Sequence, residues 1–265
     1  MIRKVIILDL DNTLYDWNDA YTISFMSLVN LHHELFSISE KDVIVNFKKY
    51  FKKQGTLEIL PTLDYMITYP NNHLNETELK ILANKSCQFF LDAWKKNISL
   101  YEGVYEAIKT LKSNDIKIIA FSDASMFWAT YRLRCLKILS AFDKIYAPLD
   151  NIKLPDCIIN NPQKYRVIDK QRRKPNTSVV EEIIKCYDID CQNVFMLGDN
   201  LNKDIECASN TGINSIWARY GTKHSSNSGK LLRNITPWTK TDTSSLISPD
   251  YTIDNFIELI KIVIE

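Results

Sequence analysis

The sequence predicts a doubly wound α/β fold with a mainly parallel sheet and an inserted helical domain. Short apolar runs stand at 4–8, 116–121, 144–147, 194–197 and 213–218. These runs are apolar on both faces instead of alternating with polar residues, as is typical of parallel strands covered by helices on both sides. Helical stripes lie between the runs, and a long stretch of helical periodicity follows the first one.

Two helical stripes separate the predicted strands of the sheet. The first comprises Val104, Ala107, Ile108 and Leu111, and the second comprises Val179, Val180, Ile183, Ile184 and Tyr187. Both follow the spacing of an amphipathic helix that packs one apolar face on a core. Because strand and helix alternate, we expect right-handed crossovers between parallel strands.

The segment 15–99 contains no strand-like run, and helical periodicity dominates it. Two of its helical faces are Tyr21, Phe25, Leu28, His32 and Leu35, and then Val43, Phe47, Tyr50 and Phe51. A third helix is expected to begin at a capping box formed by Asn75 and Glu78. We therefore predict a discontinuous α/β core, 1–14 and 100–265, with a helical domain, 15–99, placed as a lid over the carboxyl ends of the strands.

The composition is that of an ordinary globular protein, and its charge balance bears on which partners to expect. Of 265 residues, 45% are hydrophobic and 25% charged, with 33 basic and 32 acidic side chains. This balance does not favour nucleic acid or an anionic membrane as a partner. The first apolar run is too short for a signal peptide or a membrane span, so we expect a cytoplasmic protein. The six cysteines are expected to be buried, reduced thiols, with a zinc site at Cys186, Cys191 and Cys207 as the alternative.

Acidic residues follow the first predicted strand directly. Asp9 and Asp11 are two residues apart at its end and are followed by Thr13. Such a pair can supply a nucleophilic carboxylate, which also binds a hard cation, and a second carboxylate that transfers a proton. A calcium site or a simple turn is the alternative for this short pattern.

The other strand ends also carry polar residues. Ser122 follows the second strand, Lys174-Pro175 precedes a helix, and Gly198-Asp199 with Asp204 follows the fourth strand. Taken singly, the serine and the lysine are ordinary turn and surface residues. A lysine near a helix entrance lies where anions are already favoured.

In this order, the motifs resemble those of the haloacid dehalogenase superfamily. The resemblance covers the whole predicted core and continues through 205–221. It implies a Rossmann-like sheet, and the helical insert is similar to the type 1 cap of that superfamily.

The resemblance also implies roles for individual residues. Asp9 would attack phosphorus, and Asp11 would act as acid and base. Lys174 would offset negative charge, and Asp204 would orient Lys174 or a water molecule. Substrate-binding residues would be Thr13, Ser122, Asp123 and Lys174, and Mg²⁺ would be held by the side chains of Asp9 and Asp199 and the backbone carbonyl of Asp11.

Asp11 narrows the reaction that the resemblance implies. Relatives that act on carbon–halogen bonds lack an acid at this position, since their leaving group needs no proton. We therefore expect a Mg²⁺-dependent phosphatase acting on a small phosphate monoester, such as a nucleotide monophosphate or a sugar phosphate. A phosphomutase and a catalytically silent binding protein are the alternatives.

Some residues depart from the pattern or leave specificity open. Asp123 stands where many relatives have asparagine, so it would weaken phosphate binding if it pointed inward. Segments 148–173 and 222–249 are expected to be surface loops. Specificity is expected from the helical domain and its first linker, with the candidates Tyr15, Asp16, Trp17, Gly55 and 48–54.

Overall fold

The structure is a computed structural model that describes residues 4–69, 74–236 and 247–264. These residues form two compact units. The α/β unit contains 4–16, 99–223 and 247–264, and the helical unit contains 17–69, 74–98 and 224–236. Within the described ranges, no helix is long and apolar enough to cross a bilayer.

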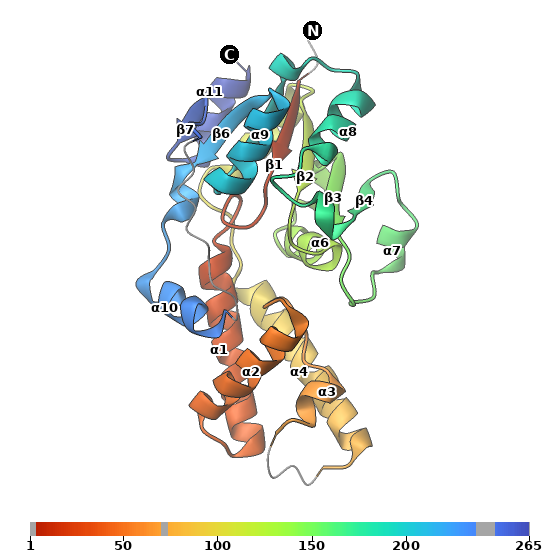
Figure 1. The fold of residues 1–265 in the computed structure, drawn as a ribbon, viewed down its shortest axis with the longest axis vertical. Coiled ribbons are helices and arrows are strands. Elements are labelled where there is room, and N and C mark those ends of the chain that lie inside the picture. The colour runs from red at the N-terminus through yellow and green to blue at the C-terminus, as the bar shows by residue number, and fades with distance from the viewer. Residues whose placement is uncertain (1–3, 70–73, 237–246, 265) are drawn as a thin grey trace. The chain divides into compact units, whose positions relative to one another are not determined.

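A seven-stranded sheet forms the centre of the α/β unit (Figure 1). Its strand order is β4-β3-β2-β1-β5-β6-β7, and each neighbouring pair is parallel. The strands are β1 (Val5–Leu8), β2 (Lys117–Phe121), β3 (Lys144–Pro148), β4 (Tyr165–Ile168), β5 (Val194–Gly198), β6 (Asn214–Ala218) and β7 (Tyr251–Ile253). Strands β1 to β4 follow one another from the centre to one edge of the sheet, and β5 to β7 follow one another from the other side of β1 to the opposite edge. The strand order therefore reverses beside β1. Open α/β sheets bind ligands at such a switch point.

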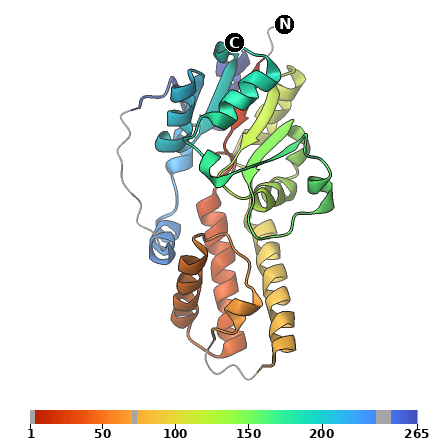
Figure 2. The ribbon, with the colours of Figure 1, turned by 45° about the vertical axis from the view of Figure 1, so that its right-hand side comes forward.

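Helices cover both faces of this sheet (Figure 2). On one face, Val5 and Ile7 belong to an apolar cluster with residues of α8 and α9. On the opposite face, Ile6 and Leu8 are equally inaccessible to solvent, and α5 contacts both β2 and α11. The helices are α5 (Val104–Ser113), α6 (Met126–Cys135), α7 (Asp156–Ile159), α8 (Ser178–Tyr187), α9 (Glu206–Thr211) and α11 (Leu259–Ile264). The predicted α/β fold class is thus confirmed.

The helical unit is built around α1, which contacts α2, α4 and α10. Its helices are α1 (Trp17–Phe36), α2 (Glu40–Gln54), α3 (Leu63–Met66), α4 (Glu76–Asn97) and α10 (Ser226–Ile235). Aromatic rings fill its interior, with Phe25 at 5.1 Å from Phe47 and 5.7 Å from Phe51 between centroids. The predicted capping box is present: Asn75 Oδ1 accepts from the Glu78 N–H, and Glu78 Oε2 accepts from the Asn75 N–H.

The structure differs from the sequence-based prediction in two segments expected to be loops. Strand β4 and the short helix α7 lie within 148–173, and α10 lies within 222–249, of which 237–246 fall outside the described residues. β4 is an edge strand with exposed central residues, and Val167 is 48% exposed, so it carries no apolar run. Helix α10 begins in a serine-rich stretch that looks like a turn, but Ser225 caps it by accepting from the Ser228 N–H.

The boundary of the helical unit also differs from the predicted one. The predicted core range 100–265 includes 224–236, yet these residues group with the helical unit. The reason is that α10 packs on α1 and α2. Local periodicity does not show which unit a helix packs on, so the return of the chain to the helical unit after β6 was not predicted.

Candidate active site

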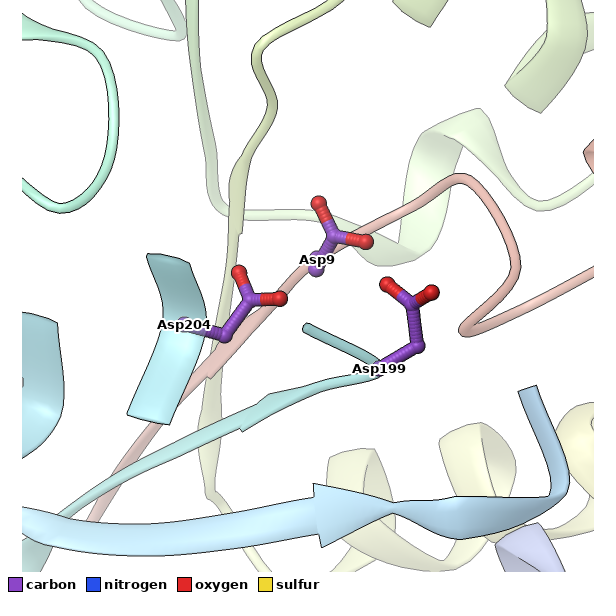
Figure 3. A group of neighbouring side chains, drawn as sticks. All are labelled: Asp9, Asp199 and Asp204. Carbon is purple, nitrogen blue, oxygen red and sulfur yellow. The ribbon is translucent and has the colours of Figure 1, made fainter. Parts of the chain in front are cut away.

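Asp9 and Asp199 leave neighbouring strands at the same edge of the sheet. Strands β1 and β5 are paired with Leu8 opposite Leu197. The backbone N–H of Asp9 donates to the Leu197 carbonyl over 2.9 Å and extends this pairing by one residue. Because both strands end here, the two carboxylates reach the same space beyond the sheet (Figure 3).

Asp204 returns to this space through a tight turn after β5. A short π-helix, Leu201–Ile205, carries it, and its Oδ2 accepts from the Asn200 N–H over 3.1 Å. A Cβ at position 198 would lie 2.1 Å from the Asp204 carboxyl carbon, so only Gly198 allows this packing. Carboxylate oxygens of Asp9, Asp199 and Asp204 all lie within 4.8 Å of one another (Figure 3).

Lys174 is the cation that contacts this group of acids. Its Nζ donates to Asp9 Oδ1 and, over 2.6 Å, to Asp204 Oδ1. The residue is 6% exposed and its Nζ lies 5.5 Å from the Phe121 ring centre. Burial alone would lower the pKa of Lys174, but the surrounding carboxylates outweigh it and raise this pKa well above the usual value. Lys174 therefore stays charged.

The three carboxylates have raised pKa values because they are buried together. Burial raises the pKa of Asp204 to about 6, with a further rise from Asp9 and an opposing effect of Lys174. Burial, followed by the charges of Asp9 and Asp204, raises the pKa of Asp199 well above its usual range. One lysine thus faces three acids, and the negative charge in the site exceeds the positive charge.

This donor set fits a hard divalent cation. Mg²⁺ prefers carboxylate and carbonyl oxygens, and the site offers several such atoms close together. A cation there would favour the ionised forms that burial disfavours. The fit rests on the clustered oxygens and their excess negative charge.

The loop after β1 is fixed by contacts with the loop after β6. Tyr220 donates its hydroxyl to the Thr13 carbonyl over 2.7 Å. A Cβ at Gly221 would lie 1.9 Å from the Asn12 carbonyl oxygen, so the two loops touch through a glycine. Thr13 in turn donates its hydroxyl to Asp9 Oδ2 over 3.1 Å. Both oxygens of Asp9 are therefore held, one by Lys174 and one by Thr13.

Asp11 lies against two side chains that the sequence analysis did not assign to it. Arg132 Nη1, from α6, donates to both Asp11 oxygens at 3.0 Å, and the Tyr15 hydroxyl donates to Asp11 Oδ1 over 2.6 Å. Arg132 was not singled out at all, and Tyr15 was considered only for substrate recognition. An arginine in an amphipathic helix is usually solvated, and its partner is 121 residues away, so no local signal pointed to this contact.

Ser122 and Asp123 follow β2, the other neighbour of β1. Ser122 is buried, and its Oγ accepts from the Ala124 N–H over 3.1 Å, which leaves its own proton available to another acceptor. Asp123 accepts from the Lys174 backbone N–H over 3.2 Å and from Lys203 Nζ over 2.8 Å. Burial would raise the pKa of Asp123, but Lys174 and Lys203 together lower it. Its charge is thus matched by a lysine that sequence reasoning also missed.

Of the remaining candidates for specificity, Asp16 ends the first segment of the α/β unit, and the others lie in the helical unit. Trp17 stacks on Tyr21 at 4.8 Å and donates its indole N–H to Glu58 over 2.9 Å. Within the lysine run, Lys49 and Lys53 line a cavity of about 180 Å³ together with Tyr50, Asp64 and others. Gly55 ends α2 in the left-handed conformation.

Comparison with known proteins agrees with this fold. A family model for haloacid dehalogenase-like hydrolases matches residues 3–212, and a second, HAD-hydrolase-like model matches 171–259. A glyceraldehyde 3-phosphate phosphatase of Pyrococcus abyssi is 35% identical over 49 residues, which is 18% of this chain and 21% of that relative. The match therefore spans about a fifth of the relative's length.

Two solved structures share the whole fold at low identity. The 2-haloacid dehalogenase of Pseudomonas syringae pv. Tomato DC3000 is 16% identical with a TM-score of 0.60, covering 100% of this chain and 99% of that chain. Magnesium-bound YfnB of Bacillus subtilis is 14% identical with a TM-score of 0.57, covering 100% of both chains. These likenesses concern the fold, and the family model covers most of the sequence. The chain belongs to the haloacid dehalogenase-like hydrolases.

Proposed function

We propose that the protein is a Mg²⁺-dependent phosphatase that hydrolyses a small phosphate monoester through an aspartyl-phosphate on Asp9. The observation that carries this proposal is the position of the Asp9 carboxylate at a strand end, in contact with Lys174 and close to the acids Asp199 and Asp204. A second carboxylate, on Asp11, follows two residues later. A buried nucleophile beside a fixed cation and a cluster of oxygen ligands suits phosphoryl transfer.

The side chains of Asp9 and Asp199 and the backbone carbonyl of Asp11 would hold Mg²⁺, which supplies positive charge against the dianionic substrate. Asp204 accepts a hydrogen bond from Lys174, so its proposed part is to orient this lysine. Lys174 then offsets the charge that accumulates when phosphate approaches a carboxylate.

The chain's own residues would carry the reaction in two displacements. The Asp9 carboxylate attacks phosphorus, the ester P–O bond breaks, and Asp11 gives a proton to the leaving oxygen. Asp11 then takes a proton from water, whose oxygen attacks the same phosphorus. The P–O bond to Asp9 breaks, so the carboxylate is restored and inorganic phosphate is released. Ser122 would donate its hydroxyl to a phosphoryl oxygen throughout.

Asp11 also favours phosphate esters over haloacids as substrates. When a carbon–halogen bond breaks, the halide leaves as a stable anion and needs no proton. When the P–O bond of an alkyl phosphate breaks, the alkoxide needs a proton, and Asp11 is the acid two residues from the nucleophile. The short match to a phosphatase of Pyrococcus abyssi supports the same class. We further propose that the helical unit acts as a cap that selects the substrate, a small molecule such as a nucleotide monophosphate or a sugar phosphate.

The test is phosphate release from 4-nitrophenyl phosphate and a panel of phosphorylated metabolites, with Mg²⁺ and with EDTA. We expect activity only with the metal, and a loss of more than about a thousandfold for Asp9→Asn. Asp115→Asn is the matched control, because Asp115 is exposed in a turn with positive φ that asparagine tolerates. Acid-quenched wild type should carry one phosphoryl group on Asp9 by mass spectrometry.

Other outcomes would point elsewhere. Full activity of Asp9→Asn would exclude the aspartyl-phosphate. Wild type that binds phosphate esters but never releases phosphate would indicate a binding protein. Transfer of the phosphoryl group to a second sugar hydroxyl would indicate a mutase, and halide release from 2-chloropropionate would indicate a dehalogenase.

A further inference from the structure

Arg132 is a fully buried cation, with 0% of its side chain exposed, and its charge is met by Asp11. Removing a guanidinium from water is costly unless a partner of opposite charge takes the place of water. One nitrogen, Nη1, lies 3.0 Å from each Asp11 oxygen, and the Tyr15 hydroxyl adds a 2.6 Å bond to Oδ1. The Asp11 carboxylate is therefore held by donors from two directions.

These two donors are themselves rigidly placed. Arg132 lies on the face of Trp128, one turn earlier in α6, with its guanidinium carbon 5.3 Å from the ring centre. Trp128 is buried, and its helix is capped by Ser125, directly after the strand-end residues Ser122 and Asp123. Tyr15 is buried as well. A long side chain that is stacked and buried loses little further freedom when it holds its partner.

The carboxylate that they hold keeps an open side. The Asp11 side chain is 25% exposed, whereas Arg132 is fully enclosed. The donors therefore occupy the inner side of the carboxylate and leave another part of it accessible. Acid and base catalysis depends strongly on where the proton is offered, since small misplacements reduce rates by large factors.

We propose that Arg132 and Tyr15 are positioning residues that fix the Asp11 carboxylate for proton transfer to the leaving oxygen. This inference rests on the proposed phosphatase function. Neither residue needs to touch the substrate, because each acts through Asp11. The alternative is that the Arg132–Asp11 pair only anchors α6 to the loop after β1.

The leaving group distinguishes these two roles. A nitrophenolate leaves readily without a proton, whereas the alkoxide of glycerol 2-phosphate requires one. A residue that acts through the acid should therefore matter for the alkyl ester and hardly for the aryl ester. A residue that only anchors a helix should affect both esters alike.

The experiment compares kcat/KM for 4-nitrophenyl phosphate and glycerol 2-phosphate, because kcat/KM reports the first phosphoryl transfer. For Arg132→Met we expect a loss of about 10- to 100-fold on glycerol 2-phosphate and less than about threefold on the aryl ester. Arg132→Lys should recover part of the loss, since a lysine keeps a cationic donor. Arg134→Met, an exposed arginine on the same helix, should stay within about twofold of wild type on both esters.

A double-mutant cycle with Asp11→Asn tests whether the effect passes through Asp11. In that background Arg132→Met should cause no further selective loss on glycerol 2-phosphate. Tyr15→Phe removes a single hydroxyl and should show the same leaving-group dependence, but more weakly. This second variant keeps the test decisive if Arg132→Met does not fold.

Two results would overturn the inference while leaving the phosphatase proposal intact. One is an equal loss on both esters for Arg132→Met and Tyr15→Phe. The other is a full, independent loss in the Asp11→Asn background. If wild type releases phosphate from neither ester nor any metabolite, the phosphatase proposal itself fails, and this inference fails with it.

Discussion

The two units of the protein each bury a polar cluster, and the two clusters differ in charge. In the α/β unit, Lys174 contacts Asp9 and Asp204, with Asp199 close by. In the helical unit, His32 lies between two hydroxyls, with Nδ1 at 2.8 Å from Tyr69 and Nε2 at 2.9 Å from Ser86. All of these cluster members except Asp199 are buried.

The helical cluster consists of neutral groups that satisfy one another. Burial lowers the pKa of His32 to about 3, so the ring is neutral at ordinary pH. Burial also raises the pKa values of Tyr65 and Tyr69, which stay protonated and contact each other. Such a network stabilises one packing arrangement and has no charge left to react. The acidic cluster holds more carboxylates than cations, and a divalent cation could offset the excess negative charge.

The largest expected effect tests whether the acidic cluster depends on its lysine. Lys174→Met leaves buried carboxylates without their cation and should reduce the free energy of unfolding by about 3–5 kcal/mol near pH 7, measured by urea denaturation. Lys203→Met is the control, because Lys203 is 47% exposed where it meets Asp123, and should cost about 1 kcal/mol or less. A loss for Lys174→Met no larger than this control would mean that the acids need no lysine.

The next effect concerns the neutral cluster and follows from the lowered pKa of His32. Between pH 6.5 and about 3 the unfolded chain binds a proton on this histidine that the folded chain does not. Stability therefore falls as pH decreases through this window, by up to about 1.4 kcal/mol per pH unit, or about 2 kcal/mol at pH 5. Above pH 7.5 the contribution is constant.

His32→Gln isolates this contribution from other titrating groups. It keeps a polar side chain that can bond to the neighbouring hydroxyls but cannot be protonated. The difference in unfolding free energy between wild type and His32→Gln should shift by about 2 kcal/mol in favour of the variant between pH 8 and pH 5. Parallel pH profiles would show that His32 is protonated in the folded protein.

A smaller effect of opposite sign is expected at Asp199. In EDTA, Asp199→Asn removes one of the crowded negative charges and should raise the free energy of unfolding by about 1 kcal/mol. Addition of Mg²⁺ should stabilise wild type, as any ligand of the folded state does, but not this variant. Asp190→Asn is the control, because Asp190 is exposed and should respond to Mg²⁺ like wild type. Destabilisation of Asp199→Asn in EDTA would contradict the excess of negative charge.

The residues of the candidate site differ in how far the sequence alone predicted them. Asp9 and Asp199 follow apolar runs, and a parallel sheet brings strand ends to one edge, so their meeting follows from local patterns. Lys174 needed the family resemblance, since a lysine beside a helix is usually solvated. Arg132 was missed, because its burial depends on Asp11, which lies 121 residues earlier and which only the folded chain brings near it.

Strand β4 and helix α10 were also missed, because local patterns do not show how an element packs on the rest of the fold. Strand β4 pairs on one side only, and Arg166 and Val167 are exposed, so packing does not require an apolar run there. Helix α10 is defined by its packing on α1 and α2 instead of by its own composition. Local periodicity reports which face of an element is buried. It does not mark an exposed edge strand such as β4, and it does not say which unit a helix such as α10 packs on.

The smallest expected effect is one on activity, and it asks whether the neutral cluster is purely structural. Tyr69→Phe removes the hydroxyl between His32 Nδ1 and Tyr65 and should cost about 1–2 kcal/mol of unfolding free energy, because a buried ring nitrogen loses its partner. Tyr105→Phe, at a tyrosine that is 57% exposed, should change stability by less than about 0.5 kcal/mol. Since the helical cluster holds no unbalanced charge, kcat/KM on 4-nitrophenyl phosphate should stay within about twofold of wild type for both variants. A large loss of activity in Tyr69→Phe at a temperature where it remains folded would show that the helical cluster, too, takes part in the reaction.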